Sequence, residues 1–193
     1  MRLLKDYLGL VLISGLVVAL DQWSKYFVRL NLAPREQWVP WEWLAPYARI
    51  INSSNTGAAF GFFKDGALFF TVVAVLVSIA IIIYYPRVPS SQTSLRVALA
   101  LQLGGAIGNL ADRLLQDGQV TDYISVARFP VFNIADAAIF LGVVILLTSS
   151  FIEGRRSRKE VEADTPDGVE HSTIEVQGSS KEAEPDGIEH STG

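Results

Sequence analysis

Two aspartates, Asp122 and Asp136, lie fourteen residues apart in the stretch V-T-D-Y-I-S-V-A-R-F-P-V-F-N-I-A-D-A-A of residues 120–138. The first lies in a β-branched and aromatic run that is typical of a short strand. The second lies inside an apolar run, residues 134–152, that is typical of a membrane helix. Where two carboxyl groups meet beside a bilayer, desolvation and repulsion raise at least one pKa, so the pair shares a proton at neutral pH. Such a pair supplies the acid and the base needed to activate water.

A structural explanation of each aspartate is also open. Asn133 and Asp136 have the spacing of a helix N-cap and its third helical residue, which favours a capping role for Asp136 taken alone. Asp122 alone fits a turn or a strand edge. A helix N-terminus favours the ionised form of Asp136, so Asp122 is the expected proton carrier, with the reservation that coupled carboxyl groups titrate as a pair.

The composition indicates a small multi-span membrane protein. Half of the 193 residues are hydrophobic, and the mean hydropathy is positive. Cysteine is absent, which excludes disulfides, thiolate catalysis and Cys-ligated metal. The two histidines, His171 and His190, lie in a polar tail, which argues against His-ligated zinc or a Ser-His-Asp triad in the membrane. We expect no metal, no cofactor and no nucleic-acid partner.

The hydrophobic runs predict an all-α membrane domain, residues 1–153, with four transmembrane helices at roughly residues 5–30, 66–85, 95–115 and 134–152. The first run resembles a signal peptide, but it has no small-x-small cleavage site and continues with helical character. Basic residues near both ends and in the short 86–94 turn place both termini in the cytoplasm. The loops of residues 31–65 and 116–133, and with them both aspartates, then face outward.

The outer loops and the tail complete this organisation. Residues 31–65 hold three tryptophans and three prolines, and the pattern predicts a strand at 49–52 followed by a turn at 55–57. A small sheet on the membrane and a plain interfacial loop are both open interpretations. Residues 154–193 begin with a basic cluster and continue as an acidic segment with a near-repeat, T-P-D-G-V-E-H-S-T and E-P-D-G-I-E-H-S-T. We expect this tail to be disordered and cytoplasmic.

Charged and polar residues inside the helices need partners. Asp21 and Lys25 are spaced i,i+4 and share a helix face, which fits an ion pair or a role in orienting an active site. Gly105, Asn109 and Arg113 share a face in the same way, with glycines that also favour close helix packing. An Asn and an Arg on one helix face need polar partners, and the aspartates of the following loop are the nearest candidates.

Five motifs in this order resemble the lipoprotein signal peptidase (signal peptidase II) family of bacterial inner-membrane aspartic proteases. They are D-Q-W-S-K (21–25), N-T-G-A-A-F (55–60), G-G-A-I-G-N-L-A-D-R (104–113), V-T-D-Y-I (120–124) and F-N-I-A-D (132–136). The resemblance implies that Asp122 and Asp136 are the catalytic dyad. It implies supporting roles for nine other residues, Asp21, Lys25, Asn55, Gly57, Gly105, Asn109, Arg113, Asn133 and Ala135.

The resemblance also implies an extracytoplasmic β-cradle and an interfacial helix on the outer face. The implied substrate is a prolipoprotein whose cysteine carries diacylglycerol, cut just before that cysteine, with globomycin-type inhibitors in the same site. Membrane lipid surrounds the enzyme, and we expect a monomer. The acidic tail departs from the family pattern.

Three other hypotheses use the same residues. A Ser–Lys dyad of Ser24 and Lys25 is disfavoured, because adjacent helix residues diverge. A proton or cation transporter would use Asp21, Asp112, Asp122 and Asp136, but these acids gather toward one membrane face and no inverted repeat is visible. A non-catalytic scaffold would use the small-residue faces, yet it would not need the acids and the arginine together.

Overall fold

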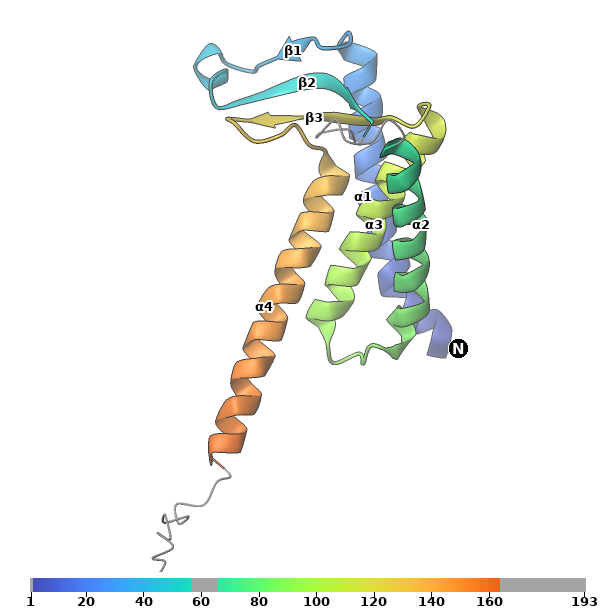
Figure 1. Cartoon of the computed structure of the whole chain (residues 1–193), viewed down its shortest axis with the longest axis vertical. Helices are drawn as coiled ribbons and strands as arrows, with labels where there is room; N and C mark the ends of the chain where they lie inside the picture. Colours follow the sequence, from blue (N-terminus) through green and yellow to red (C-terminus); the bar gives the residue numbers. More distant parts are fainter. Residues whose placement is uncertain (1, 57–65, 164–193) are drawn as a thin grey trace, which may run out of the picture. The chain divides into compact units, whose positions relative to one another are not determined.

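The computed structural model describes residues 2–56 and 66–163. The chain divides into two units, Met1–Arg155 and Arg156–Gly193, and all candidate site residues belong to the first. In the described ranges there are four long helices, α1 (Arg2–Asn31), α2 (Gly66–Tyr84), α3 (Thr93–Leu115) and α4 (Ile134–Ala163). They lie close to the four predicted segments, and a three-stranded sheet lies across one end of α1, α2 and α3 (Figure 1).

Three helical segments are long and apolar enough to cross a membrane: Tyr7–Asn31, Gly66–Arg87 and Ile134–Ile152. Their outward faces carry large apolar side chains, such as Leu76 and Phe140, of which 60% and 69% are exposed. Such continuous apolar surface requires lipid rather than water. α3 is not among the three segments, and the polar Asn109, Asp112 and Arg113 lie in its second half.

α3 is the central helix of the bundle. Its first half packs its small side chains Ala98 and Ala100, both fully buried, against neighbouring helices. Leu103 joins a core cluster with Leu10 of α1 and Tyr85, near the bundle end opposite the sheet. Since this part is filled by apolar side chains, the polar second half of α3 is held in place directly beneath the sheet.

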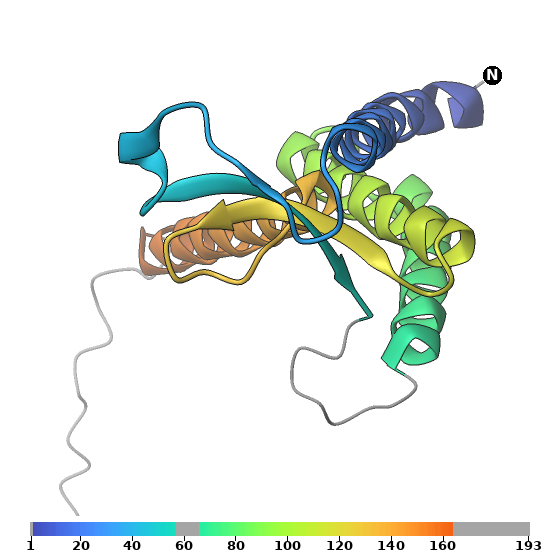
Figure 2. The same cartoon turned by 90° about the horizontal axis from the view of Figure 1, so that it is seen from above.

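The sheet consists of β1 (Gln37–Trp38), β2 (Ala48–Asn55) and β3 (Val120–Val126), antiparallel in the order β1-β2-β3. The small sheet left open by the sequence is therefore present, and the predicted strand at 49–52 lies within β2. A bulge between Ile50 and Ser53 interrupts the pairing of β2 with β3. Seen from above, β2 and β3 run across the start of α4, with α1 and α2 beside them (Figure 2). It brings β3 over the first turn of α4.

Two features differ from the prediction. The predicted span of residues 134–152 matches the apolar segment Ile134–Ile152, but the helix α4 continues to Ala163, so the first residues of the predicted disordered tail are helical. Arg, Lys and Glu, which dominate this segment, are good helix formers, which explains the extension. In the described part of the 31–65 loop, the one helical segment is the 3₁₀ turn Glu42–Leu44. Residues 57–65, which include Gly57, and the near-repeat of the tail lie outside the described residues.

Candidate active site

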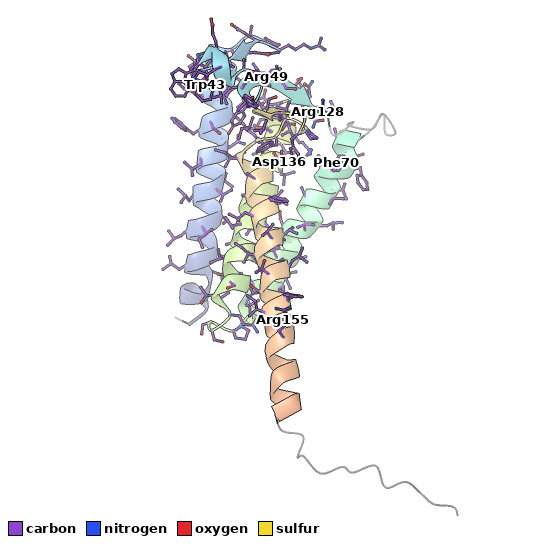
Figure 3. All side chains as sticks on the ribbon, turned by 90° about the vertical axis from the view of Figure 1, so that its left-hand side faces the viewer. Trp43, Arg49, Phe70, Arg128, Asp136 and Arg155 are labelled. Carbon is purple, nitrogen blue, oxygen red and sulfur yellow. The ribbon has the colours of Figure 1, made fainter. Side chains whose placement is uncertain are left out.

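Asp136 lies in the first turn of α4, at the end beneath the sheet (Figure 3). Its backbone N–H donates to Oδ1 of Asn133 at 2.9 Å, and the Asn133 N–H donates to Oδ2 of Asp136 at 3.3 Å. This reciprocal pattern is a capping box, so the capping role suggested by the spacing is present. The second carboxylate oxygen, Oδ1, accepts from Nδ2 of Asn109 at 2.7 Å. Asp136 therefore caps its helix and also points an oxygen toward α3.

Asp122 is buried in β3, with 4% of its surface exposed. Its Oδ1 accepts from Nδ2 of Asn133 at 2.8 Å, and its Oδ2 accepts from Nδ2 of Asn55 at 3.0 Å. Asn133 thus contacts Asp122 through its side chain and Asp136 through its backbone. One residue at the start of α4 connects the two carboxyl groups, which come from different elements.

Burial, together with the smaller effect of the Asp136 charge, raises the pKa of the Asp122 carboxyl to about 6. The hydrogen bonds from Asn55 and Asn133 oppose this shift, because they favour the ionised form. Asp122 is consequently protonated below about pH 6 and ionised above it.

We expect infrared titration of the purified protein to show a protonated carboxyl band that disappears with a midpoint near pH 6. The physical reason is the burial of Asp122, which disfavours its charged form. The Asp122→Asn variant serves as the control, because it must lack this band. The raised pKa would be contradicted if every protonated carboxyl band that belongs to residues outside the tail disappeared with a midpoint below pH 5.

A buried ion cluster fixes Asn109. Nζ of Lys25, which is fully buried, lies 2.8 Å from Oδ2 of Asp21 and 3.4 Å from Oδ2 of Asp112. The same Nζ donates to Oδ1 of Asn109 at 3.0 Å. Because its oxygen is engaged by a cation, the Asn109 amide presents its NH₂ group to Asp136. The i,i+4 pair predicted from the sequence is therefore present, and it orients a group that contacts the carboxyl pair.

Asp21 and Asp112 also hold backbone groups. Oδ1 of Asp21 accepts from the Ala135 N–H at 2.9 Å, at the start of α4. Oδ2 of Asp112 accepts from the Thr121 N–H at 2.8 Å, at the start of β3. The cluster thus anchors the two segments that carry the aspartates. Asp112 was absent from the predicted site residues, although its place three residues after Asn109 on the polar half of α3 could have indicated it.

The hydroxyl of Ser24 and the ammonium of Lys25 have different partners. The Ser24 hydroxyl donates to the Asp21 carbonyl oxygen at 2.9 Å and accepts from the Tyr123 hydroxyl at 2.6 Å. Neither bond involves Lys25, whose ammonium is held by carboxylates. A Ser–Lys dyad therefore does not form here.

Gly105 lets α3 and α4 approach closely. A Cβ atom at Gly105 would lie 2.6 Å from Cγ1 of Ile139 and against the Ala135 carbonyl oxygen. Ala135 itself is fully buried. These two residues serve the site by their small size rather than by polar chemistry.

We expect Gly105→Ala to destabilise the protein by about 1–3 kcal/mol, because the added methyl overpacks the α3–α4 contact. It should also lower activity by displacing α4. Gly15→Ala is the matched control: a Cβ there meets nothing within 4 Å, and alanine favours the helix. Thermal unfolding in detergent measures both. Equal melting temperatures for the two variants would contradict the close packing.

Arg113 lies near the carboxyl groups of Asp122 and Asp136. Its guanidinium carbon lies 5.6 Å from the centre of the Phe70 ring on α2, and Nη1 donates to the Asn109 carbonyl oxygen at 3.4 Å. Among the described residues, its buried Nε has no hydrogen-bond partner. An unsatisfied buried donor beside two carboxyl groups is costly unless a ligand completes it.

An apolar groove of about 440 Å³ opens beside these groups, between α2, α3 and α4. Asp136, Asn109 and Arg113 line its polar end, and Val73, Val77 and Ile139 are among the residues of its apolar walls. Within the described ranges, no group of three or more acidic or histidine side chains is placed to hold a metal ion. The arrangement suits a ligand with a polar centre and apolar extensions.

The comparisons with known proteins cover most of the chain. Residues 13–152 match the family model described as signal peptidase (SPase) II. The "Lipoprotein signal peptidase" of Moorella thermoacetica is 43% identical over 136 residues, covering 70% of this chain and 88% of the relative. That of Alteromonas mediterranea is 37% identical over 175 residues, covering 86% and 92%.

A solved structure supports the same assignment. A bacterial membrane enzyme solved by the in meso method at 1.9 Å resolution aligns with a TM-score of 0.66 and 28% identity, covering 72% of this chain and 90% of that one. The apolar helices and this neighbour make the protein an integral membrane protein. With the family model spanning both aspartates and the relatives covered nearly end to end, the chain belongs to the signal peptidase II family.

Proposed function

We propose that this protein is an aspartic endopeptidase that removes the signal peptide from diacylglyceryl-modified prolipoproteins, cutting just before the lipidated cysteine. Family membership supports the cleavage of lipoprotein signal peptides and does not favour the transporter and scaffold alternatives. The observation that carries the aspartic mechanism is the connection of Asp122 and Asp136 through Asn133. The raised pKa of Asp122, about 6, fits a pair that shares one proton.

In the proposed mechanism, the ionised carboxylate of the pair takes a proton from a water molecule. The resulting hydroxide attacks the scissile carbonyl carbon, and the protonated carboxyl group donates its proton to the carbonyl oxygen. The first carboxyl group, now protonated, then delivers that proton to the leaving amine of the lipidated cysteine. As the C–N bond breaks, the second carboxylate takes back a proton from a hydroxyl group of the tetrahedral species, which becomes the new carboxyl terminus. The pair finishes with one proton, as it started. No metal or organic cofactor is needed.

The neighbouring groups support this chemistry. Asn55 and Asn133 donate to Asp122, and Asn109 donates to Asp136, so the carboxyl groups are held in fixed orientations. Arg113 lines the groove beside Asp136, and its unsatisfied Nε is available to bind a substrate carbonyl oxygen. Asp21, Lys25, Gly105 and Ala135 act indirectly, by holding the helices that carry these groups. Gly57 keeps the supporting role that its motif implies.

The groove between α2, α3 and α4 suits a substrate that arrives laterally in the bilayer. We propose that α3 spans the membrane together with the three apolar segments. Both termini would then be cytoplasmic, with the carboxyl pair at the outer face of the bacterial inner membrane. We further propose that the enzyme acts as a monomer and that globomycin-type inhibitors occupy the same groove.

The cleavage position and its dependence on lipid test this proposal. Purified protein is incubated with a diacylglyceryl-modified prolipoprotein and with the same chain lacking the modification. We expect mass spectrometry to show one cut, just before the modified cysteine, and little turnover of the unmodified chain. Cleavage at other bonds, or equal turnover of both substrates, would contradict the proposed specificity.

A further inference from the structure

A second, polar pocket of about 780 Å³ lies on the outer side of the sheet region. We call it the outer pocket. The end of α1, the turn between α3 and β3, and the second half of β2 form its walls. Its lining includes Arg29, Arg35, Ser53, Ser54, Asp117 and Thr121. None of them belongs to the predicted catalytic or supporting set.

One wall of the outer pocket is an open strand edge. β1 pairs with β2 only at Ile50 and Ile51. Asn52 extends this pairing by one residue, because its carbonyl oxygen accepts from the Arg35 N–H at 2.7 Å and its N–H donates to Glu36 at 3.1 Å. At Ser54, the next residue of β2 that faces this edge, no described residue pairs with the backbone from the side of β1.

Ser54 presents its backbone to this open edge. It lies opposite Thr121 of β3, but the Thr121 N–H donates to Asp112, away from β2. In an antiparallel ladder, backbone groups alternate between the two edges. The N–H and carbonyl oxygen of Ser54 therefore point away from β3, as those of Asn52 do, and Ser54 is exposed. An extended peptide could pair with it as an added strand.

The open edge leads directly to the carboxyl pair. Asn55, the residue after Ser54, donates to Asp122 and lines the groove between the helices. On α3, Arg113 lines that groove, whereas Leu115, two residues further, lines the outer pocket. The groove and the outer pocket are thus adjacent along both β2 and α3. A substrate chain that passes Asn55 would therefore run from the groove toward the outer pocket.

The charges of the outer pocket also suit a peptide. Arg29 is held by Thr121 Oγ1 at 2.8 Å and by Asp112 at 3.5 Å. The side chain of Arg35 makes no ion pair with a described residue under the same criterion. Its backbone has a φ of 68°, in the left-handed region that disfavours arginine. Two guanidinium groups and one carboxylate, Asp117, give the lining a positive balance.

We propose that the outer pocket binds the segment of the prolipoprotein that follows the lipidated cysteine, as an extended strand added to the open edge of β2. This inference rests on the proposed function. The signal helix and acyl chains occupy the apolar groove, the scissile bond lies at the carboxyl pair, and the following residues pass Asn55 into the outer pocket. The positive lining favours acidic over basic residues in that segment.

Two matched substrates test the proposal. Both carry the same signal peptide and diacylglyceryl cysteine; one ends at that cysteine, and the other continues for about six residues, roughly 20 Å of extended chain. We expect the longer substrate to have an about tenfold higher kcat/KM, within the net contribution of one or two hydrogen bonds. A ratio near one in the wild-type protein overturns the proposal. Failure to cleave either substrate counts against the proposed function itself.

Variants at Ser54 separate backbone pairing from side-chain effects. Ser54→Pro removes the N–H that faces the outer pocket, whereas Ser54→Ala keeps it. We expect the proline variant to bring the ratio of kcat/KM values close to one and the alanine variant to retain it. Arg49 lies in the other half of β2 (Figure 3), and we expect Arg49→Gln to retain the ratio as well. A ratio that stays about tenfold in Ser54→Pro contradicts strand addition.

Modified substrates make the test independent of protein folding. Alternate residues after the cysteine form two sets, and only one set directs its backbone N–H groups toward β2. N-methylation of that set should lower kcat/KM, whereas N-methylation of the other set should leave it unchanged. Replacing acidic residues by lysine in this segment should also lower kcat/KM, and Arg35→Gly should reduce that difference. Equal effects of methylation at every residue would overturn the proposed strand.

Discussion

Replacing either Asp122 or Asp136 by asparagine is expected to lower kcat for prolipoprotein cleavage by at least about a thousandfold, while the protein still inserts and folds. Asparagine has nearly the same size but can neither take a proton from water nor return one, so the acid or the base is lost. Gel-based release of the signal peptide measures kcat, and detergent extraction from membranes followed by thermal unfolding measures insertion and folding.

The control for the aspartate variants is Glu42→Gln, which removes a carboxylate from the 3₁₀ turn beyond β1. This variant should retain wild-type turnover. A loss of activity in Asp136→Asn does not by itself separate catalysis from folding, because Asp136 also caps α4 through Asn133. Its melting temperature therefore has to be compared with that of Asp122→Asn. A well-folded variant of either aspartate with substantial turnover would contradict the carboxyl-pair mechanism.

Lys25→Met is expected to cause the largest loss of stability, about 3–5 kcal/mol, because it leaves the buried Asp21 carboxylate without its cation and Asp112 with Arg29 alone. Lys25 and Asp21 are both fully buried, and 1% of Asp112 is exposed. Asn109 also loses the donor that fixes its amide, so activity should fall together with stability. Thermal or denaturant unfolding in detergent measures the change.

The double variant Asp21→Asn/Lys25→Met supplies the control for charge. It removes one carboxylate along with the ammonium group, and an asparagine oxygen can still accept from the Ala135 N–H, as Asp21 does. We expect it to be more stable than Lys25→Met alone, since one uncompensated buried charge is gone. If the double variant were less stable than the single one, the cluster would owe its stability to contacts other than ion pairing.

The sequence predicted the helices well, because long apolar runs such as residues 66–85 have few alternatives in a protein. It also predicted that residues on one helix face, such as Asp21 with Lys25, would meet, since helical periodicity places them together. Hydropathy predicted the end of the membrane span at Ile152 correctly. It did not predict that α4 continues to Ala163, because the charged residues after Ile152 end the apolar run but not the helix.

Contacts between segments that are far apart in the sequence could not be predicted from hydropathy or helical periodicity. The spacing of Asn133 and Asp136 indicated a cap, but the contact of the Asn133 side chain with Asp122 depends on how β3 lies over α4. Asp112 likewise acquires its role only through the Thr121 N–H, which the fold brings to it. The open edge of β2 could not be predicted either, because it follows from the short pairing with β1.

The most direct test of the account is release of the signal peptide from a diacylglyceryl-modified prolipoprotein by the purified protein, followed by gel shift with and without globomycin. We predict cleavage by the wild-type protein that globomycin inhibits, and none by Asp122→Asn. A folded sample that leaves the properly lipidated substrate intact would contradict it. Asp136 would then be a helix cap, and the buried polar cluster would serve structure or transport.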